Sequence, residues 1–153
     1  MSRLSRRAML AGAVSAMVWE RAFAEGEQRM TYVARGTFSV DIKPQRDPVA
    51  AAGVSLGRMS LAKRIEGDLT GTSTGEMLTA LTPVKGSAGY VAIERVTGTL
   101  HGREGSFVLQ HSGTMDQGAQ QLAITIVPDS GTAALAGIRG VFRLRIEDGQ
   151  HYY

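Results

Sequence analysis

The sequence of 153 residues contains no cysteine, only three histidines and no long uninterrupted apolar run. Without cysteine the chain forms no disulfide, so its stability must come from a hydrophobic core and from backbone pairing. A transition-metal site is not expected, because neither His101 nor His111 stands at a recognised ligand spacing and no thiolate is available. The sequence therefore predicts neither a metal site nor a cofactor.

The chain also lacks a lasting excess of positive charge. Its formal net charge is +3, but the first 24 residues contain four arginines and one glutamate. Removing them from the 17 basic and 14 acidic residues leaves 13 of each. No basic patch remains to hold a phosphate backbone, so we expect no nucleic-acid partner.

The first 24 residues have the features of an export signal. Arg3, Arg6 and Arg7 form a basic start, an apolar run follows from Ala8 to Val18, and residues 22–24 have the small-x-small pattern of a leader-peptidase site. The apolar run is about half the roughly 20 residues that cross a bilayer as a helix. We therefore expect a signal peptide over residues 1–24 and no membrane span.

This signal resembles the twin-arginine type. Residues 5–10, SRRAML, follow the pattern Ser/Thr-Arg-Arg-x-Phe-Leu-Lys, with Met9 in place of Phe and Ala11 in place of Lys. General secretion and an uncleaved amphipathic start are the alternatives. The resemblance implies the twin-arginine export machinery and signal peptidase as transient partners, and a periplasmic or secreted location. Residues 25–153 are then expected to form a single domain.

The rest of the chain shows the period of two that half-buried strands have, and no sustained helical period. Strands are predicted over residues 32–42, 54–69, 71–80, 90–100, 106–115, 121–127 and 141–147. Residues 44–53 are predicted as a loop with a helical turn at 49–52. Asp148-Gly149 is a strong hairpin signal, although only Gln150 to Tyr153 are left to return along it.

Seven or eight short strands without helices predict an all-β fold with antiparallel connections. Closing such a sheet removes exposed edges, which favours a small barrel over an open sandwich. A barrel of about eight strands has room for packed side chains or for one small ligand.

Lys63 is the odd member of an apolar row that includes Leu61 and Ile65. In one interpretation it lies near a strand end or barrel mouth, where its stem packs and its ammonium reaches water or a carboxylate. In the other it is an interior cation that binds an anionic ligand or pairs with Glu94 or Glu76 across the lumen.

The segment Lys85–Met115 is predicted to form two strands around a turn at residues 101–105. Since both rows of its first strand are mixed, either Glu94 or Arg95 must lie among apolar neighbours, and the period alone does not decide which. In the second strand His111 shares a row with Phe107 and Leu109. A lone histidine on such a row is more often a hydrogen-bonded core residue than a ligand or a base.

Whole strands of this sequence resemble a known bacterial family. GRMSLAKRIEGDL, GEML, KGSAGYVAIERVTGTLHGREGSFVLQHSGTM and VPDSGTAALAGIRG, in this order and spacing, look like the domain-of-unknown-function family numbered 3224. The resemblance covers about residues 30–153 and implies a small barrel similar to the allene oxide cyclases and, more distantly, to the dirigent proteins. It implies no activity. Family members tend to continue beyond the last hairpin, so the final strand is expected to be truncated.

Three functions are compatible with these features. The favoured one is an exported barrel whose lumen binds a small, largely apolar or anionic molecule, with Lys63, Tyr90, Glu94 and His111 as the polar points on its wall. The second is a cyclase or isomerase that acts by positioning its substrate, with Glu94 or His111 as acid or base. The third is a structural module with a filled core that associates with copies of itself. An interior cavity would separate the first two from the third.

Overall fold

Alternating apolar and polar residues produce long extended strands from Gly36 onward in the computed structural model, which describes residues 31–153. The predicted signal peptide, residues 1–24, lies outside the described residues. Tyr32–Tyr153 forms one structural unit. Its elements are β1 (Gly36–Pro44), β2 (Val49–Ala51), β3 (Val54–Gly67), β4 (Leu69–Leu81), β5 (Ala88–Leu100), β6 (Arg103–Asp116), β7 (Ala119–Ile126), the short 3-10 helix η1 (Ala133–Leu135), β8 (Arg145–Glu147) and β9 (Gln150–Tyr152).

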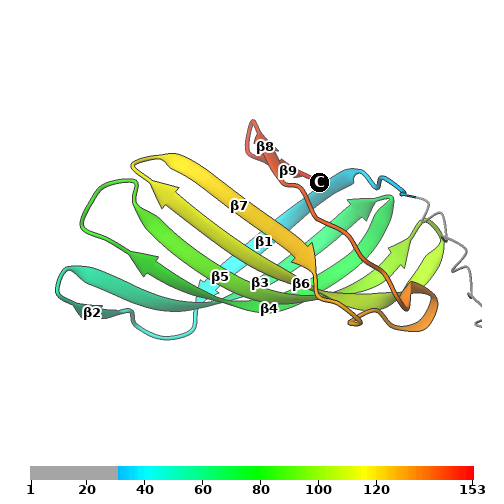
Figure 1. The fold of residues 1–153 in the computed structure, drawn as a ribbon, viewed down its shortest axis with the longest axis horizontal. Coiled ribbons are helices and arrows are strands. Elements are labelled where there is room, and N and C mark those ends of the chain that lie inside the picture. The colour runs from blue at the N-terminus through cyan, green and yellow to red at the C-terminus, as the bar shows by residue number, and fades with distance from the viewer. Residues whose placement is uncertain (1–30) are drawn as a thin grey trace, which may run out of the picture. The chain divides into compact units, whose positions relative to one another are not determined.

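All strands belong to one antiparallel sheet in the order β7-β6-β5-β4-β3-β1-β9-β8, with β2 paired to β3 (Figure 1). The all-β prediction is confirmed. The long strands β3 to β6 follow one another as antiparallel hairpins with connections of one, six and two residues, so neighbours in sequence are also neighbours in the sheet. This meander carries the side chains of four consecutive strands onto one inner surface.

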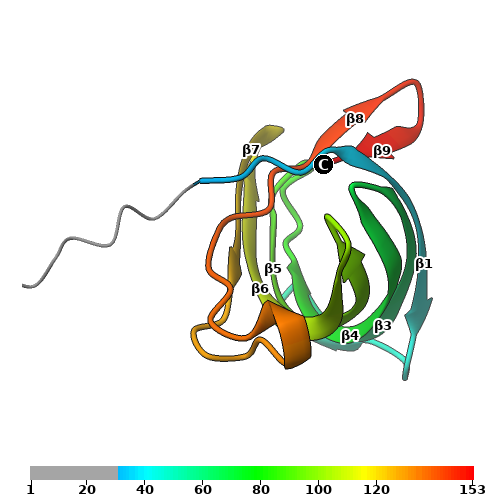
Figure 2. The same ribbon diagram turned by 90° about the vertical axis from the view of Figure 1, so that its right-hand side faces the viewer.

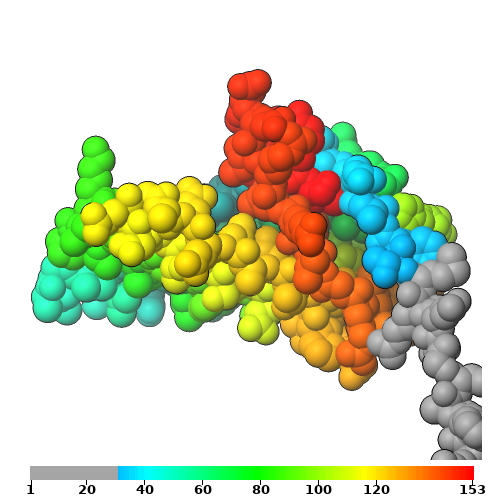
Figure 3. Space-filling view, turned by 45° about the horizontal axis from the view of Figure 1, so that its top comes forward, coloured from blue at the N-terminus to red at the C-terminus, as the bar shows by residue number. Residues whose placement is uncertain are grey.

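The sheet curls strongly but stops at a half-barrel. Viewed along the curl in Figure 2, β7 and the β8–β9 hairpin lie on opposite sides of the opening. The segment between them is irregular and contacts β7 through a single bridge, Thr125 to Val141. Figure 3 shows this segment, orange to red, lying beside the yellow β7. The barrel stays open because the two end strands of the sheet, β7 and the three-residue β8, do not pair with each other.

Glycines allow the strands to approach where the sheet bends. Gly71, Gly98 and Gly105 lie in one cross-strand row on β4, β5 and β6. A Cβ atom on Gly71 would collide with the carbonyl oxygen of Thr97, and one on Gly98 with that of Thr70. Only glycine permits such close backbones, so this row marks the sharp part of the curl.

The predicted helical turn at residues 49–52 is wrong, because Val49–Ala51 forms β2 and pairs with Val54–Leu56. Ala52 and Gly53 have φ angles of 49° and 80°. Positive φ at both central residues is the requirement of a two-residue hairpin turn, which therefore replaces the helical turn.

The C-terminal residues return along β8 as the Asp148-Gly149 signal predicts. β9 pairs with β8 and also with β1, where Tyr152 lies opposite Thr37. The Tyr153 hydroxyl accepts a hydrogen bond from the Leu69 amide at 2.9 Å. The last four residues thus complete the β1 side of the sheet.

The packed core occupies one end of the half-barrel. Its buried members come from β1, β3 to β7 and η1, and they are Phe38, Ile65, Leu69, Val96, Phe107, Leu109, Ile124 and Leu135. At the other end of the inner surface the side chains do not meet, and a cavity remains. The candidate site lies between these two regions.

Candidate functional site

The inner face of β5 carries Glu94, whose exposed fraction is 0%, while Arg95 faces outward and is exposed. This decides the question that the mixed rows of β5 leave open. Glu94 lies opposite Gly75 on β4 and Leu109 on β6. A Cβ atom on Gly75 would lie only 2.8 Å from Cα of Glu94, so the glycine makes room for the strand that carries the carboxylate.

Three neighbouring strands direct polar groups at this buried carboxylate. Nζ of Lys63, on β3, donates to Oε2 of Glu94 at 2.8 Å. The hydroxyl of Ser73, on β4, donates to Oε1. Nε2 of His111, on β6, lies 2.9 Å from Oε2. Lys63, Ser73, Glu94 and His111 form what we call the Glu94 cluster. The Lys63 and His111 side chains are nearly inaccessible, with exposed fractions of 8% and 6%.

The contact between His111 and Glu94 is close but is not a formed hydrogen bond. The distance of 2.9 Å is suitable, yet Nε2 of His111 has no partner in hydrogen-bond geometry among the described residues. The two groups are therefore in close contact at an angle that is unfavourable for a hydrogen bond. Buried polar atoms are nearly always hydrogen-bonded. The unsatisfied Nε2 atom of His111 therefore suggests that a group bound in the site is its partner.

The cluster keeps Glu94 ionised. Burial alone would raise the pKa of its carboxyl group, but the neighbouring His111, the Lys63 charge and hydrogen bond, and the Ser73 hydroxyl together lower it from 4.5 to about 2. Tyr90 is affected in the opposite sense, since its burial and the Glu94 charge raise the pKa of its phenol. The carboxylate is thus a fixed negative charge at the centre of the cluster.

A cavity of about 440 Å³ adjoins the cluster on its open side. Lys63, Tyr90 and His111 line it, whereas Glu94 and Ser73 do not. Most of the wall is apolar and comes from β1, β3, β4 and β7, including Val40, Ile42, Leu61, Met77, Leu81, Leu122 and Ile124. Of the four residues that the sequence predicts as polar points on the wall, Lys63, Tyr90 and His111 face the cavity. The fourth, Glu94, lies outside the wall and contacts Lys63 and His111.

Two aromatic rings beside Lys63 are absent from the sequence-based set of site residues. Nζ of Lys63 lies 4.8 Å from the ring centroid of Phe38 and 5.6 Å from that of Phe142. Ser73 is a further omission. Its signal is its place in the alternation of β4, since Leu69, Gly71 and Ser73 share the inner row. Phe142 belongs to the strand predicted over residues 141–147, but that prediction is wrong for its first half, because β8 covers only Arg145–Glu147 and Phe142 lies in the irregular segment before it.

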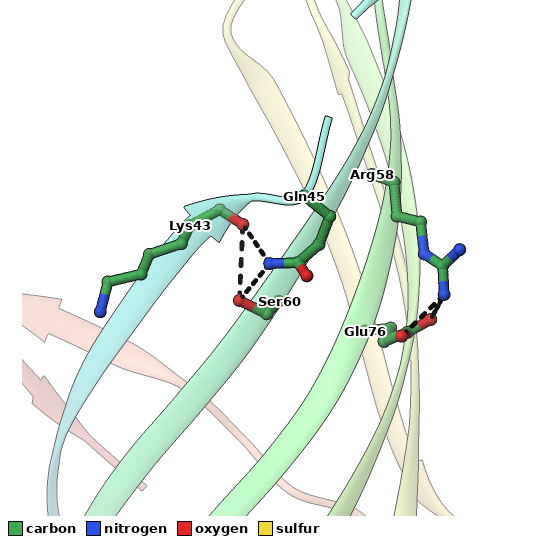
Figure 4. A network of polar contacts seen from close by, with 5 residues as sticks. All are labelled: Lys43, Gln45, Arg58, Ser60 and Glu76. Atoms are coloured by element: carbon green, nitrogen blue, oxygen red, sulfur yellow. Dashed lines mark hydrogen bonds and ion pairs between the residues drawn. The ribbon is translucent and has the colours of Figure 1, made fainter. Parts of the chain in front are cut away.

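The competing partner for Lys63, Glu76, is on the opposite face of the sheet. It forms an ion pair with Arg58 at 2.6 Å, and these side chains are 60% and 45% exposed. Figure 4 shows this pair next to the contacts of Gln45 with Ser60 and with the carbonyl of Lys43. β3 and β4 therefore carry Lys63 and Ser73 of the Glu94 cluster on their inner face and a solvated ion pair on their outer face.

Within residues 31–153, no cluster of three or more metal-ligating side chains occurs, and no helix has the length and apolarity that a membrane crossing needs. A second hollow, of about 540 Å³, lies where β1 meets the C-terminal hairpin and is lined by Arg35, Arg143 and Arg145 with two tyrosines. It contains none of the predicted site residues.

Comparison with known proteins gives a family and a solved relative. Residues 34–153 match the model of a family described as "Protein of unknown function (DUF3224)". A crystal structure of a DUF3224 protein of unknown function from Shewanella oneidensis MR-1 superimposes with a TM-score of 0.75 and 51% sequence identity. The match covers 78% of this chain and 90% of that one. No curated protein matches.

Proposed function

Because the chain belongs to the DUF3224 family, whose description assigns no function, we propose from the site alone that it binds a small, largely apolar molecule in the half-barrel. The observation that carries the proposal is the cavity of about 440 Å³ beside a buried polar cluster. Ligand sites in proteins are mostly apolar hollows of about 300 Å³ or more with a few polar groups. The cavity has this size and this character.

Maintaining such a cavity has a cost that a purely structural module need not bear. The apolar side chains that line this open hollow stay in contact with water, with Ile42 and Leu122 45% and 43% exposed, and apolar surface left unburied forgoes about 25 cal/mol per Å². Buried charges are likewise expensive unless they are paired. A structural module could fill this end of the half-barrel with larger apolar side chains, whereas a binding protein needs both the space and the polar floor.

The arrangement supports binding more directly than acid–base catalysis by Glu94. The carboxylate does not line the cavity, and both of its oxygens already have partners. With its pKa lowered to about 2 it has no proton to donate at neutral pH and is a weak base. Glu94 is a positioning residue that holds Lys63 and His111 at the cavity floor.

Native mass spectrometry of the protein purified from its own host tests the proposal. We expect a bound species of small-molecule mass that is lost on Leu122→Trp, because Leu122 lines the cavity and a larger ring there would fill it. Leu78→Trp is the matched control, since Leu78 is 55% exposed and is not part of the cavity wall. Only apo protein under several growth conditions, with no small molecule binding in vitro, would reject the proposal.

We also propose that the chain is exported through the twin-arginine route, on the strength of the sequence pattern at residues 5–10. Periplasmic delivery should be lost when Arg6 and Arg7 are both changed to lysine, which keeps the charge and removes the paired arginines. Unaltered delivery would reject this route.

A further inference from the structure

We infer that the ligand of this cavity carries a neutral carbonyl-type oxygen, which accepts hydrogen bonds from Lys63 and His111 at the cavity floor. The inference rests on the proposed function and specifies the chemical class of the ligand. The Glu94 cluster leaves hydrogen-bond donors open toward the cavity and leaves its carboxylate acceptor closed.

The acceptor in the cluster is closed to a ligand. Glu94 has an exposed fraction of 0%, its Oε1 accepts from Ser73, and its Oε2 accepts from Lys63. Glu94 also does not line the cavity. A ligand therefore cannot donate a hydrogen bond to this carboxylate, although it is the strongest acceptor nearby.

The donors, by contrast, are open. A lysine ammonium has three N–H groups, and only the bond from Lys63 to Glu94 engages one with a hydrogen-bond acceptor among the described residues. The other neighbours of Nζ are the faces of Phe38 and Phe142. Lys63 lines the cavity, so a ligand oxygen can accept from its remaining N–H groups.

His111 provides the second open group. It is 5% exposed, it lines the cavity, and Nε2 has no hydrogen-bond partner among residues 31–153. An sp² oxygen has two lone pairs and accepts from two donors at once. One carbonyl oxygen can therefore accept from Lys63 and from the Nε2–H group of His111 together.

The charges decide between a neutral carbonyl and a carboxylate. The Lys63 ammonium and the Glu94 carboxylate cancel each other's charge. A carboxylate would add an unbalanced negative charge where the Lys63 and His111 side chains are less than a tenth exposed. Burying an unpaired charge is much more costly than burying a hydrogen-bonded neutral group, so the uncharged acceptor is preferred.

A matched ligand series tests this inference on the full chain at pH 8. The reporter is N-phenyl-1-naphthylamine, a neutral apolar fluorophore, and the competitors are limonene, carvone and perillate, which share one ring skeleton. Carvone adds a neutral carbonyl to it and perillate adds a carboxylate. After correction for transfer from water to cyclohexane, carvone should displace the reporter at a concentration about tenfold or more below that of limonene, as one hydrogen bond to a charged donor predicts. Perillate should be weaker than carvone.

The double variant Lys63→Met/Glu94→Gln removes both charges, so that neither is left buried alone. It should greatly reduce the advantage of carvone over limonene, because only His111 is left to donate to the carbonyl oxygen, while the reporter still binds. The control Arg58→Met/Glu76→Gln, which removes the solvated ion pair from the outer face, should keep that advantage.

Equal displacement by limonene and carvone, or strongest displacement by perillate, overturns the carbonyl inference and leaves the binding function standing. No binding of the reporter or of any competitor overturns both. Retention of the carvone advantage in the double variant shows that Lys63 does not hold the oxygen and also overturns the inference.

Discussion

Replacing Glu94 with glutamine should destabilise the domain far more than any other single glutamate-to-glutamine change on this sheet. The amide keeps the shape of the side chain but removes the negative charge that faces Lys63 at 2.8 Å and His111 at 2.9 Å. The Lys63 side chain is 8% exposed and cannot reach bulk water without rearrangement. Breaking a buried ion pair in this way costs about 3–5 kcal/mol.

The pKa of Glu94 gives an independent magnitude and a direction with pH. The folded pKa of about 2 lies below the ordinary value of 4.5. The ionised form therefore stabilises the folded state by about 3 kcal/mol above pH 4.5, and this contribution is lost as the pH falls from 4.5 toward 2. Between pH 7 and pH 3 the wild type should lose about 2 kcal/mol of this contribution, in addition to the losses from other carboxylates, and Glu94→Gln should not lose it.

Urea unfolding at pH 7 and at pH 3, followed by far-UV circular dichroism, measures both the cost of Glu94→Gln and the loss of stability on acidification. Glu76→Gln is the control, because its partner Arg58 is 45% exposed and such surface pairs contribute about 0–1 kcal/mol. If Glu94→Gln does not fold, Lys63→Met/Glu94→Leu should restore much of the loss by removing both charges. A cost no larger than that of the control, or unchanged acid sensitivity, would refute the reasoning.

Two further substitutions test the surroundings of the site. Gly113→Ala should reduce stability by about 1–3 kcal/mol in urea unfolding and weaken binding of N-phenyl-1-naphthylamine, because a Cβ atom there would collide with the Tyr90 ring. Gly89→Ala is the control for stability alone, because its Cβ would meet nothing closer than 3.8 Å. Tyr153→Phe should cost about 1–3 kcal/mol in urea unfolding, because the Leu69 amide loses its partner. Tyr152→Phe, whose hydroxyl has no hydrogen bond among the described residues, should cost less than about 0.5 kcal/mol, and equal costs would show that the Tyr153 hydroxyl is not a clamp.

Strand alternation predicts the fold well because it reports burial directly. The inward row of Phe107, Leu109 and His111 and the hairpin at Asp148-Gly149 are found as predicted. The closure of the barrel is not, since it depends on how far the C-terminal segment reaches across the opening. That distance is a property of the curled sheet and leaves no periodic signal in the chain.

The site was only partly predictable for a similar reason. Alternation places Lys63 and His111 in apolar rows of two strands, but it does not decide whether Glu94 or Arg95 faces inward, and it does not give the register between strands. The register between strands brings Lys63 to Glu94. Glu76, the other carboxylate considered as a partner for Lys63, faces outward and pairs with Arg58. It also brings Ser73, an ordinary member of a threonine-rich strand, to the carboxylate.

The register also explains why the cavity begins where it does. Moving along the inner face of β5, Val96 belongs to the packed core, Glu94 follows, and Ala92 and Tyr90 lie beside the open end. A charged row cannot be covered by apolar side chains unless its partners are present, so the packed core ends against Lys63, Glu94 and His111. Beyond them the inner positions are occupied by the small Ala92 and Gly113, and Gly113 leaves the space that the Tyr90 ring fills. The Lys63–Glu94 ion pair thus separates the packed core from the cavity. A change at Glu94 should therefore alter stability and ligand selectivity together.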